Sequence, residues 1–174
     1  MESTPVHLAE WWRLMTRIDG HKVEGMLLRG LDEAGVDRAI LQREPMTVAT
    51  RSHDYRQVFR LAGPENCASL VVELCFLNRD DEFPATILAS PGTGRRFFEW
   101  DWSSGGDVPR AEAELSCVIS SVVRGTYTEV SWRGGFQAVA DCGVERVVAS
   151  LGVPWLQRLA RKREQRFAPY SPTR

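Results

Sequence analysis

Residues 45–102 constrain the fold most, because apolar and polar residues alternate along them with the period of a β-strand. Short clusters of Gly, Pro, Asn and Asp interrupt this alternation. The pattern predicts strands at 46–51, 54–62, 68–77, 85–90 and 95–102. Connections this short join neighbouring strands that run in opposite directions, so the sequence predicts an antiparallel meander.

The third of these strands is apolar at nearly every position of residues 70–77. Such a run is typical of a central strand that is covered on both faces of the sheet. Glu73 interrupts the run, and a carboxylate in that setting needs a partner. We expect Arg56 or Arg60 on the neighbouring strand to provide it.

Helices are predicted on both sides of the meander. A helical repeat of apolar residues indicates helices at 5–18, 21–34 and 108–124, and Asp107 is a suitable N-cap for the last of these. A sixth strand at 126–133 and two closing helices, at 136–150 and 154–166, complete the prediction. The fold class is therefore α+β: an antiparallel meander sheet of five to six strands with two N-terminal helices, one helix between the last strands, and C-terminal helices.

The composition is that of one globular domain. The chain has 174 residues, of which 43% are hydrophobic and 26% charged. We predict a single domain at 1–166, followed by a basic, proline-containing tail at 167–174. No stretch approaches the roughly 18 apolar residues that cross a bilayer, and the N-terminus lacks the pattern of a signal peptide. The expected location is the cytoplasm.

No motif for catalysis, metal binding or cofactor binding is found. The four cysteines are far apart in the sequence and have no nearby histidine, so we expect buried, reduced thiols and no metal: Cys67, Cys75, Cys117 and Cys142. Ser52, His53 and Asp54 are adjacent on a strand and cannot form a hydrogen-bonded relay. The glycine-rich segment 92–96 leads into a strand, which favours a hairpin turn over a phosphate loop. We therefore expect a protein without cofactors that is not an enzyme.

Residues 97–102 combine four aromatic side chains with two carboxylates. On a strand, Phe98, Trp100 and Trp102 share one face, and Phe97, Glu99 and Asp101 share the other. The chain contains six tryptophans in total. Since tryptophan and arginine are the residues that most often anchor interfaces, this composition favours a binding protein.

The C-terminal segment is basic. From residue 158 to 174 it carries six basic residues against Glu164 alone, so the preceding part of the chain has a formal charge of −6. Two helices joined at Gly152 would resemble a helix-turn-helix, with basic candidates for nucleic-acid contact at Arg158, Arg161, Lys162 and Arg163. The acidic body and the charged Arg158 at a normally apolar position argue against this interpretation.

A compact, mildly acidic α+β domain without cofactor motifs resembles the bacterial immunity proteins, antitoxins that inhibit a secreted or polymorphic toxin. The resemblance implies a cognate toxin, encoded nearby, whose active site this protein occludes. It implies a monomer or weak dimer that contacts neither membrane nor nucleic acid. The expected interface residues are Asp80, Asp81, Glu82, Phe97, Glu99, Asp101, Ser103 and Asp107.

Three other functions stay open. Small α+β proteins also serve as secretion or assembly chaperones for a partner protein, usually as dimers. A DNA-binding regulator would use the four basic C-terminal residues. A small hydrolase or ligand-binding domain would need a deep polar pocket lined by Glu73, Glu99 or His53.

Overall fold

The computed structural model describes residues 18–48, 55–81, 83–93, 98–101, 107–152 and 161–170. In chain order these form α2 (Gly20–Glu33), the short 3-10 helix η1 (Arg38–Ile40), β1 (Leu41–Arg43), β2 (Thr47–Val48), β3 (Tyr55–Leu61), β4 (Leu70–Phe76), β5 (Thr86–Pro91), β6 (Phe98–Asp101), α3 (Val108–Arg124), β7 (Thr128–Trp132), β8 (Gly135–Asp141), β9 (Arg146–Gly152) and β10 (Arg163–Arg166). Within this part of the chain, no helix combines the length and hydropathy that a bilayer span requires.

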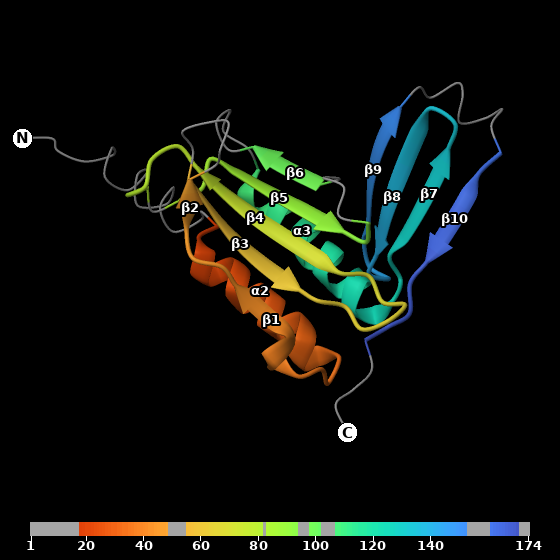
Figure 1. Ribbon diagram of the computed structural model, residues 1–174, viewed down its shortest axis with the longest axis horizontal. Coiled ribbons are helices and arrows are strands. Elements are labelled where there is room, and N and C mark those ends of the chain that lie inside the picture. Colours follow the sequence, from red (N-terminus) through yellow and green to blue (C-terminus); the bar gives the residue numbers. More distant parts are fainter. Residues whose placement is uncertain are drawn as a thin grey trace, which may run out of the picture.

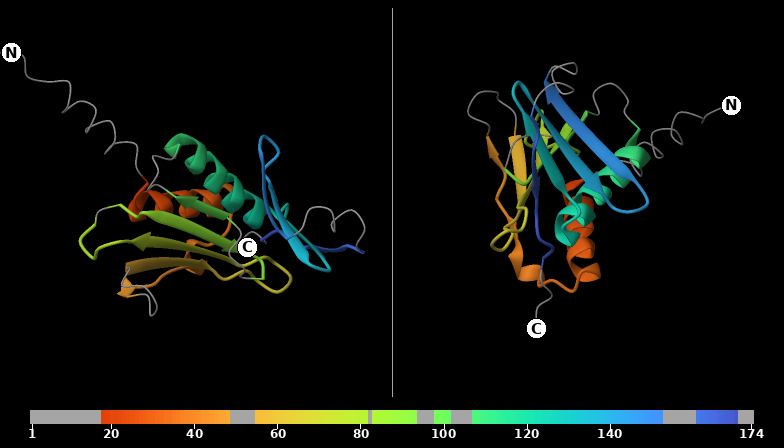
Figure 2. Two further views of the ribbon diagram at one scale, coloured as in Figure 1. Left: turned by 90° about the horizontal axis from the view of Figure 1, so that it is seen from above. Right: turned by 90° about the vertical axis from the view of Figure 1, so that its right-hand side faces the viewer.

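The strands form two antiparallel sheets (Figure 1). In the first sheet the order is β1-β3-β4-β5-β6, and β2 pairs with the same strand as β1. In the second sheet the order is β10-β7-β8-β9. Figure 2 shows that α2 and α3 both lie on one face of the first sheet, and that the second sheet stands beside α3. The two sheets are therefore joined through a shared helix.

The ends of α3 follow directly from the sequence. Asp107 caps the helix, since its Oδ1 accepts a hydrogen bond from the Arg110 backbone N–H at 3.2 Å. Pro109 lies in the first turn, where its missing N–H costs nothing. The helix ends at Gly125, whose φ of 71° is the left-handed conformation that glycine adopts without strain. Eight of its residues are buried, because it packs on both sheets.

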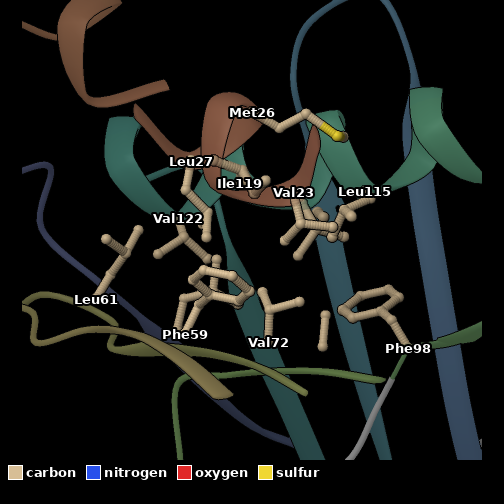
Figure 3. Packing of buried hydrophobic residues seen from close by; sticks show 14 of the residues in the cluster. Val23, Met26, Leu27, Phe59, Leu61, Val72, Phe98, Leu115, Ile119 and Val122 are labelled. Atoms are coloured by element: carbon tan, nitrogen blue, oxygen red, sulfur yellow. The ribbon is translucent and has the colours of Figure 1, made fainter. Parts of the chain in front are cut away.

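The main core lies between the two helices and the first sheet (Figure 3). Val23 and Leu27 of α2 point from the helix layer towards Phe59 and Val72 of the sheet. Leu115, Ile119 and Val122 of α3 and Phe98 of β6 join the same cluster, and all of these side chains are buried. Burial of apolar surface on this scale is the main source of stability in the fold.

The predicted closing helices are wrong. The region predicted as a helix at 136–150 is the hairpin of β8 and β9, and residues 163–166, expected to end the last helix, form β10. Only two α-helices occur among the described residues. The predicted helix at 5–18 lies almost entirely outside them, and so do residues 153–160 of the predicted last helix.

The prediction of one meander sheet is also wrong, since the strands divide between two sheets. The expected strands at 54–62, 68–77, 85–90 and 126–133 are confirmed as β3, β4, β5 and β7. β4 is not covered on both faces, because buried and half-buried residues alternate along it. Of the two expected partners of Glu73, Arg56 is confirmed, since its Nη1 lies 3.3 Å from Glu73 Oε2, whereas Arg60 pairs with Glu44.

Residues beyond β10 return to the first sheet. Ala168 forms a parallel bridge with Cys67, and its N–H donates to the Asn66 carbonyl at 2.8 Å. The buried Tyr170 donates its hydroxyl hydrogen bond to the Ala68 carbonyl at 2.6 Å. The boundary between a domain at 1–166 and a tail at 167–174 stays a prediction.

Candidate functional site

The candidate site is a groove between the outer strands of the two sheets. β6 is the last strand of the first sheet and β9 the last of the second, and neither has a second neighbouring strand among the described residues. Figure 1 shows both strands beside α3. A cavity of about 410 Å³ lies between them. It is lined by Phe98, Glu99 and Trp100 of β6, Arg110 and Glu114 of α3, and residues 146–149 of β9.

A second hollow of about 280 Å³ continues from this cavity to the N-terminus of α3. It shares Glu99, Trp100, Arg110 and Glu114 with the cavity and adds Asp101, Asp107 and Ala111. We call the two hollows together the β6–β9 groove. Its long wall is β6, which has no second neighbouring strand among the described residues.

Glu114 organises the floor of the groove. Its carboxylate accepts a hydrogen bond from the Trp100 indole N–H at 2.8 Å and another from Arg110 Nε at 2.8 Å. The Trp100 ring also stacks on Phe98, with a centroid distance of 6.3 Å and an interplanar angle of 13°. Because Phe98 is buried in the core, this half-buried tryptophan is held in one orientation before any partner arrives.

The groove is acidic near the N-terminus of α3. Among the described residues, its lining there has four carboxylates, those of Glu99, Asp101, Asp107 and Glu114, and the guanidinium of Arg110. Arg110 forms an i, i+4 ion pair with Glu114 that raises the pKa of the guanidinium. Arg146 adds a positive charge only at the end next to β9. The charge of the lining therefore suits a positively charged partner at the α3 end.

Three of the described interface candidates, Asp80, Asp81 and Asp101, lie at one end of the first sheet. Thr86 pairs with both Cys75 and Asp101, so the β4–β5 connection leaves the sheet at the end where β6 finishes. Asp80 and Asp81 lie in that connection, and Asp81 Oδ2 accepts a hydrogen bond from the Asn78 N–H at 2.9 Å. Glu82, Phe97 and Ser103 lie outside the described residues.

The predicted division of residues 97–102 is confirmed for the four residues that form β6. Phe98 is buried and Trp100 half-buried, whereas Glu99 and Asp101 are exposed. Sequence reasoning missed Arg110, Glu114 and Arg146 as groove residues. The i, i+4 spacing of Arg110 and Glu114 in the sequence is sufficient to predict an ion pair on a helix. The contact of Glu114 with Trp100 could not be predicted, because it depends on how α3 packs against β6.

The basic C-terminal residues do not form a helix-turn-helix in the part of the segment that the structure describes. Residues 147–152 belong to β9, and Arg163 begins β10. Arg161 and Lys162 are exposed just before that strand, and Arg158 lies outside the described residues. The arrangement that supported nucleic-acid contact is thus overturned by strand pairing.

Metal-ligating side chains and cysteines are further groups that could form a site among the described residues. No group of three or more His, Cys, Asp or Glu side chains in the described ranges is placed to hold a metal ion. The four cysteines are unbridged, but only Cys117 is fully buried, whereas the other three are half-buried, which corrects the expectation that all are buried. Comparison of the chain with protein-family models, curated proteins and solved structures finds no match.

Proposed function

We propose that this chain is a protein-binding inhibitor of the immunity type, and that its β6–β9 groove receives a basic segment of a cognate toxin. The observation that supports the proposal is a groove whose described lining is acidic and whose wall, β6, has no second neighbouring strand among the described residues. A toxin whose active site binds an anionic substrate presents positive charge, which such a groove would cover.

An open strand edge offers backbone N–H and C=O groups to an extended segment of another protein. β5 pairs with one edge of β6 along its whole length, from the pair Ala89 and Phe98 to the pair Thr86 and Asp101. The opposite edge borders the groove. An added strand there would lie over α3 and place alternate side chains against Trp100 and Glu114.

The carboxylates would act mainly on the association rate. Charges at the rim of an interface steer the encounter and fix its orientation, and they contribute less to the lifetime of the complex. Trp100, held by Glu114 and Phe98, would be the buried anchor that determines the lifetime.

Co-expression with the product of the neighbouring gene tests the proposal, with the association rate constant of the purified pair measured at low and high salt. The double variant Glu99→Lys with Asp101→Lys should lower that rate constant roughly 10-fold to 100-fold at low salt, and most of the difference should vanish at high salt. Trp100→Ala should act mainly on the dissociation rate.

Glu65→Lys is the matched control, because this exposed glutamate lies in the β3–β4 connection, at the opposite end of the first sheet. It should leave both rate constants within about twofold of the parent values. A double variant that binds as fast as Glu65→Lys, or a neighbouring gene product that forms no complex, would refute the proposal.

A further inference from the structure

Two cysteines that are distant in the sequence share one hydrogen-bond acceptor. The Sγ atom of Cys117 on α3 lies 3.4 Å from the Glu145 carbonyl oxygen, and the Sγ atom of Cys142 lies 3.3 Å from the same oxygen. The two sulfur atoms are therefore no farther apart than those two distances together. Neither cysteine lines the β6–β9 groove.

The two thiols differ in how accessible they are to solvent. Cys142 lies in the turn that joins β8 to β9, where its N–H donates to the Glu145 carbonyl at 3.1 Å and closes a tight hairpin. The turn residues Gly143 and Val144 are exposed, and Val144 is fully so, which leaves Cys142 open to small reagents. Cys117 is 3% exposed.

The surroundings of the two thiols give them different reactivity. The neighbouring Cys117 side chain is the main cause that lowers the pKa of Cys142. Burial, followed by the neighbouring Cys142, raises the pKa of Cys117 to about 12. Because Cys142 is also the more accessible of the two, it is the nucleophile of the pair, and the buried Cys117 is the thiol that attacks second.

We propose that Cys117 and Cys142 form a dithiol pair that converts to an intramolecular disulfide by exchange with small disulfides such as oxidised glutathione. The Cys142 thiolate attacks one sulfur of oxidised glutathione, breaks its S–S bond and releases one glutathione thiolate. Cys117 then loses its proton and attacks the Cys142 sulfur, which releases the second glutathione. Two protein thiols are oxidised, one glutathione disulfide is reduced, and the two protons end on the two released thiolates.

The product would tie α3 to the β8–β9 turn. The bond closes a loop that contains the end of α3, β7 and β8. A cross-link over such a loop restricts the unfolded chain, so we expect the oxidised protein to melt roughly 5–10 °C above the reduced one.

The test incubates the reduced, purified full chain with oxidised glutathione, then blocks free thiols under denaturing conditions and measures intact mass. The wild-type protein should lose two of its four blockable thiols without retaining glutathione, and peptide mapping should join Cys117 to Cys142. Cys67→Ser and Cys75→Ser are the matched controls and should give the same disulfide.

Cys117→Ser separates the two steps. Serine keeps a hydrogen-bond donor beside Cys142 but cannot form the second S–S bond, so this variant should accumulate one glutathione on Cys142. Cys142→Ser should take up none at Cys117, because that thiol is buried. Circular dichroism of each variant checks that it is folded.

Two results would overturn the inference. One is a wild-type protein that keeps all four thiols, or that pairs either cysteine with Cys67 or Cys75. The other is a folded Cys117→Ser variant that retains no more glutathione than the Cys142→Ser variant. In that case Cys142 would not be the attacking thiol.

Discussion

At the scale of single residues, Glu129 of β7 links the two sheets. It is 3% exposed, and its Oε1 accepts hydrogen bonds from the Tyr127 hydroxyl at 3.1 Å and the Thr93 N–H at 3.0 Å. Thr93 belongs to the turn that follows β5, so a residue of the second sheet holds a turn of the first. Gly92 has a φ of 66°, and a Cβ at that position would collide with the Glu129 carboxylate, so only glycine fits there.

Replacing Glu129 with alanine should lower the free energy of unfolding by about 2–4 kcal/mol, because it leaves the buried Tyr127 hydroxyl and the Thr93 N–H without an acceptor. Glu129→Gln keeps one acceptor oxygen and should cost about 1–2 kcal/mol. Urea unfolding of the two variants and the parent measures the difference. Equal losses for alanine and glutamine would mean that the hydrogen bonds contribute nothing beyond packing.

Two buried tyrosines make the fold sensitive to alkali. Burial is the first cause that raises the pKa of Tyr127 and of Tyr170, followed by the charge of Glu129 in the first case and of Cys67 in the second. An unfolded phenol ionises near pH 10, whereas these two stay protonated in the native state. The two tyrosines make their full contribution to the free energy of unfolding below about pH 10. This contribution is lost as the pH rises towards the higher native pKa values.

The free energy of unfolding should therefore fall above about pH 10 by up to roughly 1.4 kcal/mol per pH unit for each tyrosine. Tyr170→Phe removes one of these groups and should give a shallower decline, although it also costs about 1 kcal/mol at pH 8 because the Ala68 carbonyl loses its donor. Urea unfolding at pH 8 and above pH 10, with reductant present, measures the slopes. Identical slopes for parent and variant would contradict the assignment.

At the scale of elements, two glycines of α2 differ in their surroundings, so that substitutions at them distinguish the effect of helix propensity from the effect of packing. Gly25 is exposed, and a Cβ added there meets no atom within 4 Å. A Cβ added at Gly30 would lie 2.7 Å from Cγ2 of Ile119 on α3. α2 and α3 therefore approach each other closely at Gly30 and not at Gly25.

Gly25→Ala should raise the free energy of unfolding by about 0.5–1 kcal/mol, because alanine is the better helix former. Gly30→Ala should lower it by about 1–2 kcal/mol, because the gain in propensity is smaller than the cost of moving α2 away from Ile119. Thermal or urea unfolding of the pair decides the matter. If both variants stabilise the protein, the two helices are not in close contact at Gly30.

The elements show where sequence reasoning succeeds. The helix at 108–124 was predicted with the bounds of α3, because Asp107 and the apolar stripe mark the same helix. Arg56 and Arg60 were both expected as partners of Glu73 because they lie on the neighbouring strand, and the structure selects Arg56. β6 and its two faces followed from strict alternation. Where the capping residues and the apolar periodicity of a segment indicated the same element, the sequence was sufficient to predict it.

The β8–β9 hairpin was missed although residues 136–150 carry strand and turn signals. They contain four valines, which favour a strand, and Gly143, which favours a turn. The alanines, glutamate and arginine of the segment are good helix formers, but Phe136, Ala138 and Ala140 share one face and pack into the core, so burial of that face decides the structure. The β6–β9 groove could not be predicted, because it requires the edge of a second sheet that the sequence placed in a helix.

At the scale of the whole molecule, the segment after β10 connects both sheets to α3. Phe167 stacks on Tyr127 with a centroid distance of 5.6 Å, and Tyr170 is buried against the first sheet. The Tyr170 N–H donates to the Val123 carbonyl of α3 at 2.9 Å, which supplies a partner for one of the last carbonyls of that helix. The segment thus closes the structure on the side away from the groove residues of β6.

A chain that ends at Arg166 should therefore lose about 3–5 kcal/mol of its free energy of unfolding, because it gives up two buried or half-buried aromatic rings and the hydrogen bonds to Ala68 and Val123. A chain that ends at Tyr170 keeps all of these contacts and is the matched control, with stability expected within about 0.5 kcal/mol of the parent. Urea unfolding followed by tryptophan fluorescence measures both. If the shorter chain matches the control, the segment lies on the surface without holding the two sheets together, and the link between them must rest on α3 and Glu129 alone.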